Sequence, residues 1–205
     1  MTSTAALALN TLSFCAAIAM LIGAYKAHNS YKTKQSLAFL TTFSLVAIGL
    51  LLELIVETEF AAGLETTLQT TLGITSSFLL ILSALTLLAA YTLLLFVVEK
   101  ITNTTMHVLA AALIVLTLIL ATQYFLVVYA VTALILALLA HRFYNNFLEK
   151  NSKESLIVYL AFLALLIGYA AALLAPISAF ASLAYHGLQL IGYFLLFAML
   201  WRVSR

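Results

Sequence analysis

The stretch TKQSLAFLTTFSLVAIGLLLELIVE, residues 33–57, decides the fold of this 205-residue chain. The 18 positions from 35 to 52, between Lys34 and Glu53, carry no charge. A helix that crosses a bilayer needs about 20 predominantly apolar residues, because each backbone N–H and C=O must find its partner inside the segment. The stretch therefore predicts a transmembrane helix.

The whole chain shares this apolar character. Hydrophobic residues make up 65% of it and charged residues 8%, whereas a soluble domain has roughly 45–50% and about 25%. The apolar runs are too long for the alternating strands, about ten residues each, of a membrane β-barrel. We therefore predict an all-α membrane protein, in contact with the lipid bilayer, with one transmembrane domain over residues 1–205.

Several classes of protein are disfavoured by what the chain lacks. Cys15 is the only cysteine, so an internal disulfide is excluded. No basic residue precedes the first apolar run, so we expect a permanent span there rather than a cleaved signal peptide. The basic residues are scattered in short loops, which argues against a nucleic-acid partner. No nucleophile or phosphate-loop motif indicates an enzyme.

Hydropathy predicts seven transmembrane helices. We expect them at residues 5–25, 37–56, 74–98, 106–121, 125–140, 155–175 and 183–201. The fourth and fifth are separated only by Thr122–Tyr124, where neither Gly nor Pro forces a turn.

The distribution of basic residues supports seven spans and sets the orientation. With the N-terminus outside, all nine Lys and Arg residues fall on one side of the membrane. The positive-inside rule makes that side, and the C-terminus, cytoplasmic, so we expect a multi-pass protein of the cell membrane. One long helix over residues 106–140 would instead divide the basic residues between the two sides. In this topology Glu57, Glu59 and Glu65 lie in an external loop.

A second stretch, SKESLIVYLAFLALLIGYAAALLAP at residues 152–176, resembles the first when it is shifted by 119 positions. Seven of the 24 positions from Lys34 and Lys153 onward are identical, where roughly three are expected by chance in so biased a composition. The match predicts a parallel 3+1+3 internal repeat, in which helices over residues 5–98 and 125–201 form two units and the helix at 106–121 links them. Some transporters are built on this plan.

In this layout the chain resembles the sugar-transporter and PQ-loop group, and also microbial rhodopsins. The signature residues of both are absent. Pro176 is the only proline and is not followed by Gln, and no lysine lies inside a predicted span, where retinal could be attached. The likeness is therefore one of topology, which does not carry function.

Glu53 is the leading candidate for a functional residue, because ionisable groups within a span are costly. It is present in one copy of the repeat only, since Ala172 is its counterpart. It could form a cation or proton site, or anchor a ligand amine. Alternatively, it lies within a turn of the interface and reaches headgroups or water.

His186 is the second candidate. Together with Tyr185 and Gln189 it forms a polar stripe that could face Glu53 or Gln69 across the bundle. Such a histidine could act as a proton-sensitive switch or a metal ligand. Alternatively, it is an interfacial histidine among aromatic residues. One Glu and one His are too few to predict a metal site.

Two weaker sets of polar residues complete the candidates. His107 and His141 should lie at similar depth in a helical hairpin, a spacing that permits haem or a transition metal. Both are also expected near the interface, where histidine is tolerated. Six hydroxyl-bearing residues are expected to form hydrogen bonds between helices rather than to act as nucleophiles: Thr41, Thr42, Ser44, Thr75, Ser76 and Ser77.

These observations leave three functions open. The first is a small-solute or ion translocator or binder, with its site between the two three-helix units. The second is a sensor or accessory subunit, which would bind a membrane-protein partner or form a homo-oligomer without transporting anything. The third, and the least favoured, is a haem- or metal-binding redox protein. No cofactor is predicted.

Overall fold

The computed structural model describes residues 4–61, 71–100, 104–121 and 126–203, and helices account for nearly all of them. The seven helices are α1 (Thr4–Tyr31), α2 (Lys34–Ala61), α3 (Thr71–Val98), α4 (Thr104–Ala121), α5 (Leu126–Lys150), α6 (Lys153–Ala172) and α7 (Ala179–Val203). The predicted all-α fold is confirmed.

Six helices in the described ranges are long and apolar enough to cross a membrane, namely α1, α2, α3, α5, α6 and α7. Large apolar side chains point away from the bundle along them; Leu134 is 67% exposed and Phe194 is 59% exposed. Soluble proteins rarely expose large continuous apolar surfaces, so side chains in this arrangement are typical of helices that face lipid tails. The chain is therefore built as a multi-pass membrane protein.

Three helices extend beyond their expected ends. The sequence predicted ends at residues 25, 56 and 140, whereas α1 continues to Tyr31, α2 to Ala61 and α5 to Lys150. Hydropathy marks the apolar part of a helix, but the helix itself ends where its backbone conformation changes. Lys32 and Asn151 have φ values of 48° and 46°, in the left-handed region that ends helices.

The α6 helix is shorter than predicted, ending at Ala172 instead of residue 175. Residues 173–177 form a turn around Pro176. Proline disfavours helical conformation in the residue before it, so the helix ends early.

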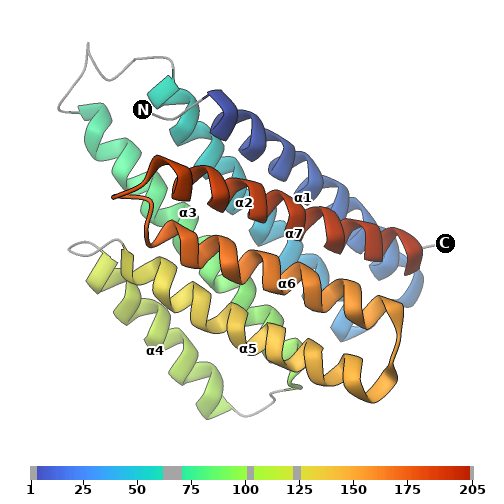
Figure 1. The fold of residues 1–205 in the computed structure, drawn as a ribbon. Coiled ribbons are helices and arrows are strands. Elements are labelled where there is room, and N and C mark those ends of the chain that lie inside the picture. The colour runs from blue at the N-terminus through green and yellow to red at the C-terminus, as the bar shows by residue number, and fades with distance from the viewer. Residues whose placement is uncertain (1–3, 62–70, 101–103, 122–125, 204–205) are drawn as a thin grey trace.

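The helices form a closed ring. Around the ring the order is α1, α2, α3, α5, α6 and α7. Neighbours in this order pack against each other, and α7 closes the ring by packing against α1. Figure 1 shows these helices running up and down side by side, with α4 outside the ring against α5. The helix α4 also contacts α3. The core of the protein therefore lies on the axis of a six-helix ring.

Helices α2 and α6 begin in the same way. Thr33 Oγ1 accepts a hydrogen bond from the backbone N–H of Ser36 at 3.1 Å, and Ser152 Oγ accepts one from that of Ser155 at 3.2 Å. Each side chain satisfies an N–H that has no partner within the helix. Both helices begin with the motif Lys-x-Ser-Leu, at residues 34–37 and 153–156, and in both the residue before the motif forms the N-terminal cap.

All basic residues in the described ranges lie at one end of the ring, which we call the basic end. They are Lys26, Lys32, Lys34, Lys100, Arg142, Lys150, Lys153 and Arg202. Arg142 Nε lies 3.3 Å from Glu99 Oε1 there, joining α5 to the end of α3. Both side chains are substantially exposed, so this ion pair adds little stability.

Glycines let neighbouring helices approach closely, and Gly49 and Gly168, which correspond to each other under the shift of 119 positions, are two of them. A Cβ at Gly49 would lie 2.7 Å from Leu87 Cγ, and one at Gly168 would lie 3.3 Å from the backbone oxygen of Tyr185. Ser83 Oγ on α3 donates a 2.8 Å hydrogen bond to the Gly49 carbonyl. The absence of a side chain therefore brings α2 onto α3, and α6 onto α7.

The prediction of interhelical hydrogen bonds was wrong for Thr41, Thr42 and Ser44, and the side chains of Thr75, Ser76 and Ser77 lie outside the described part of the chain. Each of the first three hydroxyls donates to the carbonyl four residues earlier in α2, at 3.0, 2.9 and 2.8 Å respectively. A hydroxyl on a helix can always reach that carbonyl, so it needs no partner helix.

Replacing Gly192 by alanine is expected to destabilise the protein. The new Cβ would lie 2.6 Å from Leu165 Cγ and 3.0 Å from the carbonyl oxygen of Ala161, a backbone atom that cannot move aside easily. Overpacking of this kind costs about 1–3 kcal/mol. Thermal unfolding of the purified protein measures the effect.

The matched control is Gly187→Ala on the same helix, where nothing lies within 4 Å of the new Cβ. It should leave the unfolding temperature unchanged or raise it, because alanine is favoured over glycine in a helix by about 1 kcal/mol. Equal effects of the two substitutions would contradict close packing of α6 and α7 at Gly192.

Candidate functional site

Four buried polar residues meet near the end of the ring opposite the basic end. Glu53 and Glu57 lie one turn apart on α2, and their side chains are on the same face because residues i and i+4 are neighbours on a helix. Glu53 is 5% exposed, Glu57 7%, His186 on α7 5% and Asn10 on α1 0%. We call these residues the Glu–His cluster.

Glu57 is the centre of the Glu–His cluster. Its Oε1 lies 3.1 Å from His186 Nε2, and its Oε2 accepts a 3.0 Å hydrogen bond from Asn10 Nδ2. One carboxylate therefore joins α1, α2 and α7. The sequence placed Glu57 in an external loop, and this was wrong because α2 continues to Ala61.

Glu53 completes the Glu–His cluster. One ligand atom from each of Glu53, Glu57 and His186 can be chosen so that all three lie within 4.8 Å of one another. The side chains of Tyr185 and Gln189 also interact with the Glu53 carboxyl. Glu53 is thus buried inside the ring, rather than directed at headgroups or bulk water.

A cavity of about 190 Å³ adjoins the Glu–His cluster. Glu53, Glu57 and His186 line it, and so do Ser182 and Ala175 beside the turn between α6 and α7. The carboxylates and the imidazole therefore border a space large enough for a small ion and several waters.

Several buried polar atoms in and beside the Glu–His cluster have no hydrogen-bond partner among the described residues. They are Asn10 Oδ1, Glu53 Oε2, His186 Nδ1, Gln189 Oε1 and Tyr169 Oη. Those of Glu53 and His186 belong to residues that line the cavity. Buried polar atoms in native proteins are nearly always paired, so each exception calls for an explanation. A bound ion or ordered waters would supply the missing partners.

A cluster of tyrosines extends from the Glu–His cluster toward the middle of the ring. The Tyr185 ring contacts that of Tyr169 with centroids 5.4 Å apart, and Tyr169 contacts Tyr91 at 6.0 Å. Tyr91 Oη lies 2.6 Å from Tyr193 Oη, a buried hydrogen bond between α3 and α7. These aromatic rings fill the axis of the ring.

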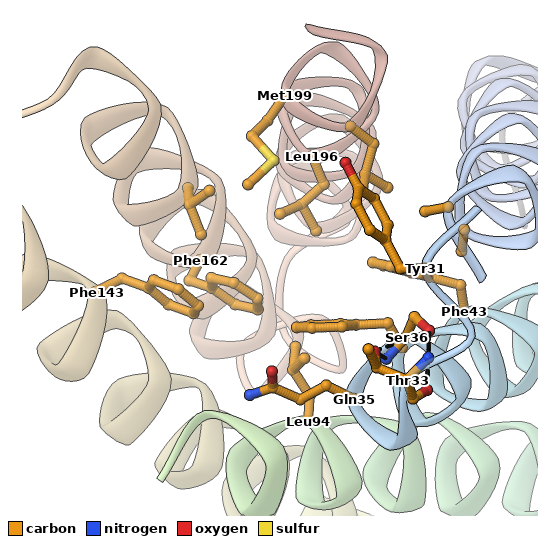
Figure 2. Close-up of a pocket in the computed structure, with 15 residues that line it drawn as sticks. Tyr31, Thr33, Gln35, Ser36, Phe43, Leu94, Phe143, Phe162, Leu196 and Met199 are labelled. Carbon is orange, nitrogen blue, oxygen red and sulfur yellow. Dashed lines mark hydrogen bonds between the residues drawn. The ribbon is translucent and has the colours of Figure 1, made fainter. Parts of the chain in front are cut away.

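A second cavity, of about 460 Å³, lies on the axis near the basic end. Figure 2 shows Phe143 and Phe162 stacked on one side of it, and Thr33, Gln35 and Ser36 at another. Its lining is mostly apolar and comes from all six helices of the ring. This cavity could hold an apolar group but offers no charged side chain.

A packed layer separates the two cavities. On α7, Tyr193 lies between His186 and Leu196, which line the first and second cavity respectively. On α2, Leu50 lies between Glu53 and Phe43 in the same way. Side chains less than 2% exposed form this layer, which we call the central layer: Leu50, Leu87, Leu88, Leu136, Leu165, Tyr91, Tyr169 and Tyr193.

Of the three other candidate residues, only His141 has a described side chain, and it does not lie at this site. Gln69 lies outside the described residues, as does the side chain of His107. His141 is exposed at the basic end, where its Nε2 lies 3.2 Å from Asn145 Nδ2. Among the candidates whose side chains are described, the structure therefore brings together Glu53, Tyr185, His186 and Gln189.

Sequence reasoning missed two residues of the Glu–His cluster, Asn10 and Glu57. Both left a signal. Glu57 follows Glu53 by four positions, which places both acids on one helix face. Asn10 interrupts the apolar run ALALNTLSF, where an amide is costly unless it has a partner.

Comparison with protein-family models, with curated proteins and with solved structures found no match for this chain. The fold and the Glu–His cluster alone therefore define its class. It is a helical multi-pass membrane protein with a buried acidic and histidine site beside a small cavity.

Proposed function

We propose that this protein binds a small cation at the Glu–His cluster and carries it across the cell membrane. The observation that carries the proposal is that two buried carboxyl groups and an imidazole lie together. Glu53 and Glu57 supply two carboxylates, His186 supplies at most one positive charge, and every Lys and Arg of the described residues lies at the basic end. A buried negative charge requires a cation beside it.

The energetic need for a cation can be estimated from the spacing of the ligand atoms. Two carboxylates with oxygens within 4.8 Å of each other repel by at least about 3 kcal/mol at an effective dielectric constant of ~20. A bound cation converts this repulsion into attraction. The unpaired Glu53 Oε2 is available for such an ion.

Transport, rather than binding alone, is supported by the two cavities. They lie on one axis, on either side of the central layer. In a carrier the binding site is accessible from one side of the membrane while the path to the opposite side is closed. Movement of one structural unit of the protein against the other then opens the path to the opposite side. The Glu–His cluster lies on one side of the central layer, and the cavity near the basic end lies on the other side. This order of site, barrier and cavity is the one that a carrier needs.

The order of helices in the ring supports two moving units. Contacts of α1 with α2 and of α2 with α3 recur as contacts of α5 with α6 and of α6 with α7. In the proposed repeat α1 corresponds to α5, and α3 corresponds to α7. The contact of α1 with α7 therefore has its counterpart in the contact of α5 with α3. Together with the shared caps of α2 and α6, this pattern favours the parallel 3+1+3 repeat, with seven spans and α4 as the linker outside the ring.

The proposed units would contribute different groups to the site. Glu53, Glu57 and Asn10 belong to the first unit, and His186 belongs to the second. Under the shift of 119 positions, Glu53 corresponds to Ala172, and Asn10 to Tyr129. A site that spans both units would come apart when they move, which is what release of the ion needs. With the basic end in the cytoplasm, the site faces outward.

The test is cation flux into liposomes that contain the purified protein. Uptake of protons, Na⁺, K⁺, Mn²⁺ and Zn²⁺ is followed with dyes inside the vesicles. We expect at least one cation to enter faster than into empty vesicles, and Glu53→Gln to slow that uptake by about tenfold or more, because it removes one charge from the site.

Glu149→Gln is the matched control, because this glutamate is exposed at the basic end. It should leave the uptake unchanged. The proposal fails if no cation enters faster than into empty vesicles, or if Glu53→Gln and Glu149→Gln behave alike.

A further inference from the structure

We infer that the cation is a divalent first-row transition metal ion, in the range from Mn²⁺ to Zn²⁺, held by Glu53, Glu57 and His186. This inference rests on the proposed function, because it names the substrate of the same site. Three features carry it: the spacing of the three ligand atoms, the chemistry of the donors and the charge of the complex.

The spacing is close to that of a metal site. The three ligand atoms lie within 4.8 Å of one another. Metal–ligand bonds of about 2.0–2.2 Å place neighbouring ligand atoms roughly 3.4 Å apart. The His186 and Glu57 atoms are already 3.1 Å apart. A shift of Glu53 by about 1 Å, within the freedom of its side chain, completes the set.

An unpaired atom of the described residues points to a missing ligand at this place. Glu53 Oε2 is buried without a hydrogen-bond partner, and Glu53 lines the cavity of about 190 Å³ together with Glu57 and His186. Three protein ligands leave open positions on the ion, which waters in the cavity can fill, as is usual where a metal is exchanged or does chemistry.

The donor set selects the class of metal. Two carboxylates favour hard divalent ions, and an imidazole favours ions from iron to zinc over Mg²⁺ and Ca²⁺. Among the described residues the group of possible ligands contains no sulfur, and Cys15 is exposed on the surface of α1. Soft ions such as Cu⁺ are therefore disfavoured.

Charge balance favours a divalent over a monovalent ion. Two carboxylates and a neutral imidazole with a 2+ ion form a neutral complex, whereas Na⁺ or K⁺ would leave one negative charge. In a membrane interior an unbalanced charge is costly, so the divalent complex is preferred.

Asn10 acts as a positioning residue. Its Nδ2 donates to Glu57 Oε2 and thereby turns Oε1 toward His186. Groups that orient a ligand in this way typically contribute about 10- to 100-fold in metal affinity. Asn10→Leu should therefore weaken metal binding without removing a ligand.

The test uses the full-length protein in detergent, titrated with Zn²⁺ by calorimetry and with Co²⁺ by visible absorption. We expect one ion per chain, and d–d bands that show nitrogen and oxygen ligands. His186→Gln should lower the affinity by about 100-fold. His141→Gln, which alters an exposed histidine, is the matched control and should bind as the wild type does.

Thermal unfolding with and without Zn²⁺ provides a second measurement, which also shows whether each variant is folded. The metal should raise the unfolding temperature of the wild type and of His141→Gln, but not that of His186→Gln. If His186→Gln does not fold, Asn10→Leu takes its place and must bind metal more weakly than the wild type.

Each outcome bears on a different claim. Equal Zn²⁺ affinity of the wild type and His186→Gln would overturn the metal site, and so would equal affinity for Zn²⁺ and Mg²⁺. Failure to bind any transition metal, with proton or Na⁺ flux that still depends on Glu53, would overturn the inference and leave the proposed function standing. Absence of both metal binding and cation flux would overturn both.

Discussion

Glu53→Gln is expected to stabilise the metal-free protein at pH 9, although the same change should abolish transport. At high pH the carboxyl groups of Glu53 and Glu57 are both ionised. Their oxygens lie within 4.8 Å of each other, so the repulsion is about 3 kcal/mol at an effective dielectric constant of ~20. Glutamine keeps the shape of the side chain and removes this repulsion.

The increase in the free energy of unfolding should therefore be of the order of 2–3 kcal/mol, and it should shrink as the pH falls, because a proton on one carboxyl also removes the repulsion. Saturating Zn²⁺ should reverse the order of stability. An ion at 1,000 times its dissociation constant stabilises the wild type by about 4 kcal/mol, and the variant should gain far less.

Asn10→Leu provides the contrast within the same cluster. It removes the hydrogen bond to Glu57 Oε2, so a buried charged group loses a partner, and this should destabilise the protein by about 1–3 kcal/mol. Unfolding of both variants across a pH series is the measurement. If Glu53→Gln were less stable than the wild type at every pH, Glu53 would be a structural residue and not half of a strained ion site.

The membrane helices could be predicted from the sequence because they depend on local composition. The uncharged run between Lys34 and Glu53 has few alternatives to a transmembrane helix once it is in lipid. The helix ends could not be predicted in the same way. They depend on single residues such as Lys32, whose left-handed conformation has no signal in its side chain, whereas the Asn151 that ends α5 is of a type that favours this conformation.

The candidate site could be predicted in part. Glu53, Tyr185, His186 and Gln189 stood out because each is a polar group in an apolar helix. Glu57 was misplaced because two acids near the end of an apolar run usually mark its exit from the membrane. What buries Glu57 is contact with Asn10, 47 positions away in sequence, and no local pattern reports such a contact.

The cavities and the central layer lay beyond sequence reasoning. A cavity is the space left when helices of given shape are packed, so it depends on all six helices of the ring at once. The Tyr91–Tyr193 hydrogen bond joins residues 102 positions apart. The sequence shows that each tyrosine lies within an apolar helix. It contains no local pattern that predicts a contact between the two.

Tyr193→Ala is expected to make liposomes containing the protein leaky to protons and small cations. Tyr193 is 0% exposed and Tyr91 2% exposed, and their rings fill the axis between the two cavities. Alanine removes the ring and the hydroxyl of Tyr193, so the cavity at the Glu–His cluster would extend toward the one at the basic end. Because an apolar constriction is what stops ions, we expect a rise in passive flux of about tenfold or more.

Two variants separate the loss of the ring from other effects. Tyr193→Phe keeps the ring and should stay closed, although Tyr91 Oη loses its partner at 2.6 Å. Tyr25→Ala removes a tyrosine that is 56% exposed and should leave the passive flux unchanged.

Removal of a buried aromatic ring costs about 3–5 kcal/mol, so the folded fraction of Tyr193→Ala must be measured in the same vesicles. Tyr193→Leu serves as a milder variant. If folded Tyr193→Ala is as tight as Tyr193→Phe, the central layer is not the barrier, and the path of the ion lies elsewhere in the ring.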